Sequence, residues 1–160
     1  MLVDYPNHGK GRIWRVSKLP IPVAVTPTPD PMPKKGTLSE ISELLKSEDP
    51  FVRHAAVMWM EDTNEDLLAE ELAKDMDARV RVGAFLTLRR MNPSDKKSQI
   101  LTALNDSDIE VRRLALLWAA EQRDLSLRPA LDSVLSAGPV TPLLFNTYLA
   151  AAKMVNPIDG

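Results

Sequence analysis

Few residues of this chain belong to the types that most often catalyse reactions or bind metals. Its 160 residues include no cysteine and only two histidines, His8 and His54. The absence of cysteine excludes thiol nucleophiles and thiolate zinc sites, and neither histidine stands beside a glutamate or at metal-ligand spacing from the other. No G-x-S-x-G turn presents a serine nucleophile. We therefore expect no catalytic residue, no metal site, no cofactor and no site for a small-molecule substrate.

Arginine and tryptophan side chains point instead to the binding of a partner. Trp59 and Trp118 each follow an aspartate, Asp49 or Asp108, by ten residues, which indicates equivalent places in a repeated unit. Two interpretations stay open: the rings pack between helices, or they anchor a partner on a surface that they share with arginines. The second interpretation predicts a set of partner-binding residues, namely Trp59, Trp118, Arg89, Arg90 and Arg113.

The elements that would position these residues are indicated by a pattern, D-x-x-V-R, that occurs three times. Its aspartates are separated by 28 residues and then by 31 residues, close to the length of a helical repeat. Apolar residues recur at helical spacing on both sides of each copy. We therefore expect each unit to be two helices joined by a short acidic turn. The copies are Asp49, Val52 and Arg53; Asp77, Val80 and Arg81; and Asp108, Val111 and Arg112.

Each residue of the pattern has an expected physical role. The aspartate is placed to cap the second helix, because its carboxylate can accept the free amide hydrogens of the first turn. Pro50, directly after Asp49, fits the first helical position. The valine, and an alanine four residues after it, face the partner helix and allow a close approach. We expect the arginine to bridge to the capping aspartate of its own unit or of a neighbouring one.

This combination resembles the HEAT repeats, particularly the short bacterial kind related to those of phycobilisome lyases. The resemblance covers residues 37–123, with three copies of the motif. A fourth unit is expected from Leu127 to Val155, with helices near Leu127–Leu135 and Pro142–Val155 and with Thr141 as the cap. It lacks the Val-Arg pair, which suits a terminal repeat that has no neighbour on its outer face.

Residues 1–36 have a different character. Seven of the 13 prolines lie at or before Pro33, so the segment 20–33 should be extended. The alternation over 11–17 is typical of a short strand. This strand, with its sequence G-R-I-W-R-V, is similar to the closing strand of the β-propeller in bacterial multidomain membrane-bound dehydrogenases, where HEAT repeats and a cytochrome c domain follow. We interpret residues 1–36 as an extended arm or linker. The resemblance to the dehydrogenases implies that this segment includes the end of a preceding β domain.

The charge of the chain disfavours nucleic acid as the partner but leaves room for a local basic face. It carries 20 Lys and Arg against 22 Asp and Glu residues, a formal net charge of −2, with a pI near 5.7. Such a chain is not attracted as a whole to phosphates or anionic lipids. Salt bridges between repeats explain the same arginines as a basic strip would. The strip would contain Arg53, Arg79, Arg81, Arg89, Arg90, Arg112 and Arg113.

Together these observations predict an all-α fold, a right-handed α-solenoid of about four HEAT-like helical hairpins over residues 37–157, preceded by the extended Pro-rich arm. The expected function is that of a non-catalytic scaffold or protein-protein interaction module, whose partner is a protein or a neighbouring domain. One alternative is an accessory domain of an extracytoplasmic dehydrogenase or electron-transfer protein, which would place this chain outside the cytoplasm. Another is nucleic-acid binding through a basic concave face. No apolar run reaches the ~20 residues that span a membrane.

Overall fold

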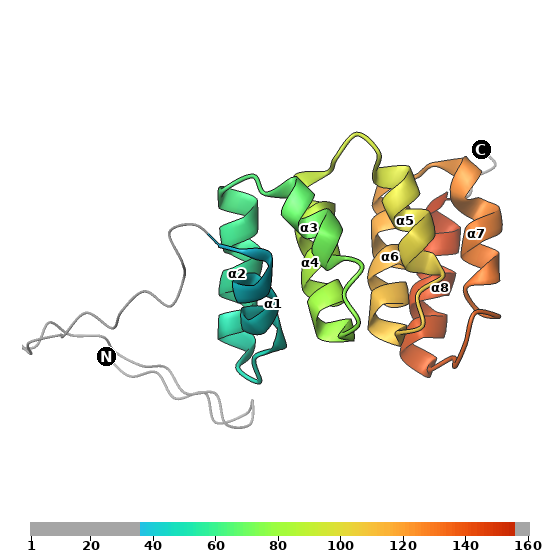
Figure 1. Ribbon diagram of the computed structural model, residues 1–160. Helices are drawn as coiled ribbons and strands as arrows, with labels where there is room; N and C mark the ends of the chain where they lie inside the picture. Colours follow the sequence, from blue (N-terminus) through green and yellow to red (C-terminus); the bar gives the residue numbers. More distant parts are fainter. Residues whose placement is uncertain (1–35, 156–160) are drawn as a thin grey trace, which may run out of the picture. The chain divides into compact units, whose positions relative to one another are not determined.

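All regular structure in the described part of the chain is helical. A computed structural model describes residues 36–155, which contain eight α-helices, one 3-10 helix and no strand (Figure 1). The predicted all-α class is therefore confirmed for this range. The arm over 1–36, apart from Gly36, and the strand over 11–17 lie outside the described residues. The helices are α1 (Leu38–Lys46), α2 (Pro50–Asp62), α3 (Asp66–Leu72), α4 (Ala78–Met91), α5 (Lys96–Leu104), α6 (Ile109–Gln122), the 3-10 helix η1 (Leu125–Leu127), α7 (Arg128–Ser133) and α8 (Pro142–Val155).

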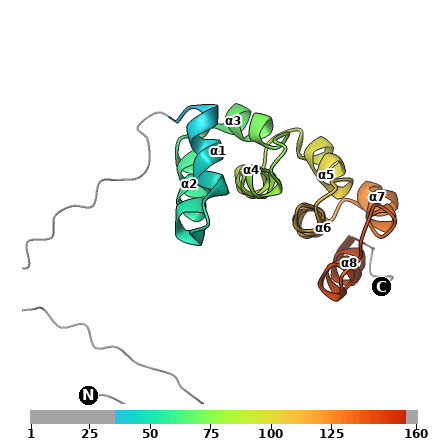
Figure 2. The same cartoon turned by 60° about the horizontal axis from the view of Figure 1, so that its bottom comes forward.

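These helices form two rows. The outer row holds α1, α3, α5 and α7, and the other row holds α2, α4, α6 and α8 (Figures 1 and 2). Each helix of the outer row packs on the helix that follows it in sequence, and α2, α4, α6 and α8 pack on one another in order. Figure 2 shows that the rows curve, with the second row on the inner side. We call α2, α4, α6 and α8 the inner helices; their exposed faces make one inner surface.

The inner helices begin where the capping residues predict. The side chains of Asp49, Asp77 and Asp108 each accept a hydrogen bond from the backbone amide two residues further on, at 2.8, 2.8 and 2.9 Å. Thr141 Oγ1 accepts from the amide three residues further on at 3.2 Å. Pro50 occupies the first position of α2. The predicted caps are thus confirmed, and each contributes ~1 kcal/mol to stability.

The core lies between the two rows. The alanine four residues after each motif valine is at most 1% exposed, which confirms the predicted apolar register. Val80 and Val111 are buried, and Val52 is half-buried. Gly83 allows α4 to approach α1, because a Cβ at this position would lie 2.4 Å from Leu45 Cδ2. The buried alanines are Ala56, Ala84 and Ala115, and the aligned buried residues of the outer row are Ile41, Ala69 and Ile100.

Candidate functional site

The three motif arginines share one structural task. In each, Nη1 donates hydrogen bonds to two backbone carbonyls of the turn that precedes its own helix. The distances are 2.6 and 3.0 Å for Arg53, 2.8 and 3.0 Å for Arg81, and 2.9 and 3.0 Å for Arg112. The guanidinium groups therefore hold the turns between outer and inner helices in place. The acceptors are the carbonyls of Ser47 and Glu48, of Asp75 and Met76, and of Asp106 and Ser107.

Two of these arginines also reach the turn of the next hairpin. Arg81 meets Asp106 through Nε and Nη2, both at 2.8 Å, and Arg112 Nη2 donates to Pro139 O at 2.8 Å. The prediction that these arginines bridge to a capping aspartate is therefore wrong. The capping carboxylates already accept amides of their own helices, so the arginines pair with acceptors nearer the middle of the next turn.

One position of the repeat was missed by the sequence reasoning. The residue two places before each capping aspartate accepts a hydrogen bond from that aspartate's backbone amide, at 3.2, 2.8 and 2.7 Å. Asp106 also carries the Arg81 bridge, and Asp75 accepts from the Ser42 hydroxyl at 3.1 Å. A short side-chain acceptor at the same offset in all three copies was the available signal. These residues are Ser47, Asp75 and Asp106.

The two predicted tryptophan anchors have different environments. Trp118 is 1% exposed and belongs to the core, so it offers no surface to a partner, and its place among the anchors is corrected on that ground. Trp59, at the equivalent position in α2, is half-buried at the N-terminal end of the row of inner helices. Packing between helices therefore describes Trp118, while Trp59 retains an accessible edge.

The three predicted arginine anchors each face a carboxylate. Arg89 Nε donates to Glu121 at 2.8 Å, Arg90 lies 3.1 Å from Glu61, and Arg113 lies 2.8 Å from a glutamate one turn earlier in its own helix. The bond from Arg89 holds the pKa of Glu121 below its ordinary value, against the opposing effect of burial. Because Arg112 is also fully buried, the motif arginines do not form the continuous basic strip that a nucleic-acid site needs.

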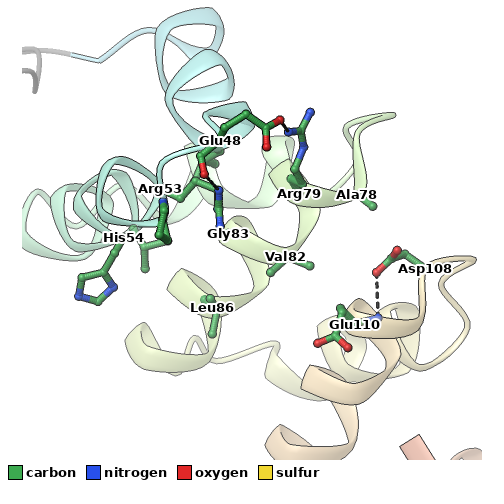
Figure 3. Close-up of a pocket in the computed structure, with 13 residues that line it drawn as sticks. Glu48, Arg53, His54, Ala78, Arg79, Val82, Gly83, Leu86, Asp108 and Glu110 are labelled. Carbon is green, nitrogen blue, oxygen red and sulfur yellow. Dashed lines mark hydrogen bonds and ion pairs between the residues drawn. The ribbon is translucent and has the colours of Figure 1, made fainter. Parts of the chain in front are cut away.

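A pocket of about 550 Å³ opens on the inner surface (Figure 3). It is lined by residues of α1, α2 and α4 and, at one side, by the cap and first turn of α6. Figure 3 shows Val82 and Leu86 on the face of α4 that is directed into this space. Its floor is apolar, and a pocket of this size is within the ~300–1,000 Å³ typical of ligand sites. The apolar lining residues are Leu45, Pro50, Val57, Ala78, Val82, Gly83 and Leu86.

The rim of the pocket is polar, and its two arginines both have partners. Arg79 lies 2.6 Å from Glu48 and 3.2 Å from Asp77, and its hydrogen bonds lower the pKa of Asp77. Arg53 is bound to the turn carbonyls. Its neighbour His54 is exposed. Three rim carboxylates face two guanidinium groups, so the rim is close to neutral. The rim residues are Glu48, Arg53, His54, Arg79, Asp108 and Glu110.

Two further properties of the described residues bear on function. Over residues 36–155, no three His, Cys, Asp or Glu side chains come close enough together to hold a metal ion. In the same range, every helix is too short or too polar to cross a membrane. Comparisons with models of protein families, with curated proteins and with solved structures found no match to this chain.

Proposed function

We propose that residues 37–157 form a non-catalytic, protein-binding scaffold of the HEAT type, a right-handed α-solenoid of four helical hairpins. Three copies of one cap, one valine and one arginine in the same register support this assignment. The two rows of helices, each hairpin packed on the next, support it as well. The role is the same if the chain belongs to a larger extracytoplasmic electron-transfer protein.

The pocket on the inner surface is the observation that carries the proposal. Its floor collects apolar side chains from α1, α2 and α4, and such a floor gains free energy when an apolar group of a partner covers it. In the rim, Arg79 pairs with Glu48 and Arg53 donates to turn carbonyls, so both guanidinium groups already have partners and offer little to a small anionic ligand. A peptide segment that places an apolar side chain on Val82 and Leu86 fits this lining.

A peptide selection tests the proposal directly. Random peptides displayed on phage are selected on the immobilised chain, and the affinity of the selected peptides is measured by isothermal titration calorimetry. Replacing Leu86 by Glu places a charge on the apolar floor, and we expect binding to weaken at least about tenfold, equivalent to ~1.4 kcal/mol. Val82→Glu should act in the same way.

The matched control is Leu67→Glu on α3, where the leucine is 73% exposed and lies outside the pocket. This variant should bind like the parent chain, and circular dichroism establishes that all variants are folded. Selection of no peptide, or of peptides that bind the Leu86 and Val82 variants unchanged, would contradict the proposed binding surface.

A further inference from the structure

Each inner helix has two opposite side faces, one toward the preceding hairpin and one toward the next. Positions are counted from the capping residue, so that the motif arginine is position 4. At about 100° per residue, positions 4, 8 and 12 form one stripe, and positions 6, 10 and 13 form another whose centre lies about 165° away. We call these the forward stripe and the backward stripe. In α4 the forward stripe is Arg81, Phe85 and Arg89; in α6 the backward stripe is Leu114, Trp118 and Glu121.

An ion pair joins the two stripes at the same positions in two junctions. Glu61, at position 12 of α2, lies 3.1 Å from Arg90, at position 13 of α4. Arg89, at position 12 of α4, donates to Glu121, at position 13 of α6, at 2.8 Å. In the first junction position 12 carries the negative charge, and in the second it carries the positive charge. In both junctions position 12 of one helix pairs with position 13 of the next. In the junction between α6 and α8 both positions are apolar.

The forward stripe of α8 is open. The residue at position 8 is 3%, 3% and 0% exposed in α2, α4 and α6, where another hairpin follows, but Leu149 at this position of α8 is 50% exposed. Phe145, at position 4, is 42% exposed, and Lys153, at position 12, is also exposed. A hairpin whose outer face meets water normally carries polar residues on that face. This one has two large apolar residues and one charge.

The backward stripe of α2 is open as well. The residue at position 10 is 0%, 1% and 1% exposed in α4, α6 and α8, whereas Trp59 at this position of α2 is half-buried, even though Gly36 lies against its ring. Asp62, at position 13, is exposed. Within the described residues, neither Asp62 nor Lys153 takes part in an ion pair.

We propose that the two open stripes bind each other between copies of this chain. The forward stripe of α8 in one copy packs on the backward stripe of α2 in the next, as α4 packs on α6 within a chain. Phe145 and Leu149 then cover the ring of Trp59. Lys153, at position 12, meets Asp62, at position 13, so the charges complement each other across the new junction by the rule that holds inside the chain.

This contact is heterologous, because the two faces differ, and each added copy presents the same open stripe again. Such contacts extend into open chains of copies when the rotation between copies does not close a ring. The apolar area is small, so self-association should be weaker than the micromolar to picomolar affinities of standard interfaces, with a dissociation constant roughly in the range of tens to hundreds of micromolar.

Sedimentation velocity of the full chain over a series of concentrations tests the proposal. The weight-average sedimentation coefficient of the parent chain should rise with concentration. Lys153→Glu and Asp62→Lys, each at an exposed position, create repulsion across the junction and should each weaken association about tenfold or more. The double variant restores opposite charges and should associate like the parent. Lys74→Glu, at an exposed lysine in the turn after α3, is the control for net charge.

Mixing the two single variants gives the sharpest result. At one junction between unlike variants the carboxylate introduced on α8 faces the ammonium group introduced on α2, and at the other junction the original Lys153 faces the original Asp62. Only junctions between like variants repel, so we expect the mixture to associate like the parent, with the two variants in alternating order, while each variant alone associates weakly. A parent chain that stays monomeric at all concentrations would overturn the proposal, because another molecule must then cover these faces. So would association that Asp62→Lys leaves unchanged, since α8 would then be pairing with α8.

Discussion

The junction from α4 to α6 and the junction from α6 to α8 use an arginine at the same position in different ways. Arg81 meets the Asp106 carboxylate, and both side chains are 12% exposed. Arg112 is 0% exposed and donates to three backbone carbonyls, and its Nε has no hydrogen-bond partner within the described residues. The first junction is an ion pair near water, and the second is a buried cation held by peptide dipoles.

The turn opposite each arginine explains this difference. In the first junction the turn supplies an aspartate, whereas in the second Gly138 and Pro139 occupy the corresponding place. Gly138 leaves room for the guanidinium group, because a Cβ there would lie 3.2 Å from Arg112 Nη1. The Pro139 carbonyl can then approach to 2.8 Å. The repeat motif therefore fixes the arginine as the hydrogen-bond donor, and the sequence of the next turn decides whether a carboxylate or a backbone carbonyl accepts the bond.

Removing Arg112 should have the largest effect on stability. Arg112→Ala leaves three carbonyl groups without their charged donor and creates a cavity, so the free energy of unfolding should fall by roughly 3 kcal/mol. Urea denaturation followed by circular dichroism measures the change. Arg113→Ala, at the adjacent half-buried position whose arginine pairs with a glutamate of its own helix, is the control and should cost about 0.5 kcal/mol or less. Equal losses in the two variants would remove the distinction between a fully buried and a half-buried arginine.

Removing Arg81 should have an intermediate effect. Arg81→Ala breaks a bidentate pair that is mostly shielded from water, and we expect a loss of about 1–2 kcal/mol. Because its partner is a carboxylate, the loss measured in urea should shrink as sodium chloride is added, since salt screens charges that water reaches. The loss from Arg112→Ala should depend less on salt. Identical salt dependence for both variants would contradict the comparison.

The smallest effect concerns pH and the other ion pair between α4 and α6. The Arg89 hydrogen bond lowers the pKa of Glu121 below 4.5 in the folded chain, so the pair stabilises the fold above that pH. This stabilisation is lost as pH falls through the lowered pKa. Glu121→Gln should therefore cost about 0.5 kcal/mol at neutral pH, a difference that disappears in acid.

Denaturation curves of the parent chain and of Glu121→Gln between pH 3 and pH 7 measure the difference between their free energies of unfolding. This difference should be about 1 kcal/mol or less at every pH. Glu71→Gln removes an exposed pair between the end of α3 and the turn that follows it, and is the control for net charge. A gap between the parent and Glu121→Gln that widens in acid would have the wrong sign.

Local features of the sequence predicted much of the fold. Asp49, Asp77, Asp108 and Thr141 cap their helices because a cap involves only neighbouring backbone amides. The apolar period likewise identifies the buried face of each helix. The arginine partners and the pocket could not be predicted in this way. Each depends on turns that lie about one repeat apart in the chain, and a long side chain can reach several acceptors in such a turn.

Trp59 and Trp118 show most clearly the difference between what the sequence determines and what the tertiary structure decides. The sequence by itself determined that they occupy the same position of two repeats, because that position follows from counting residues after a capping aspartate. Only the tertiary structure decided that Trp118 is buried while Trp59 is half-buried. The physical reason is that burial of a backward stripe requires a preceding hairpin, which the described chain supplies to α6 and does not supply to α2.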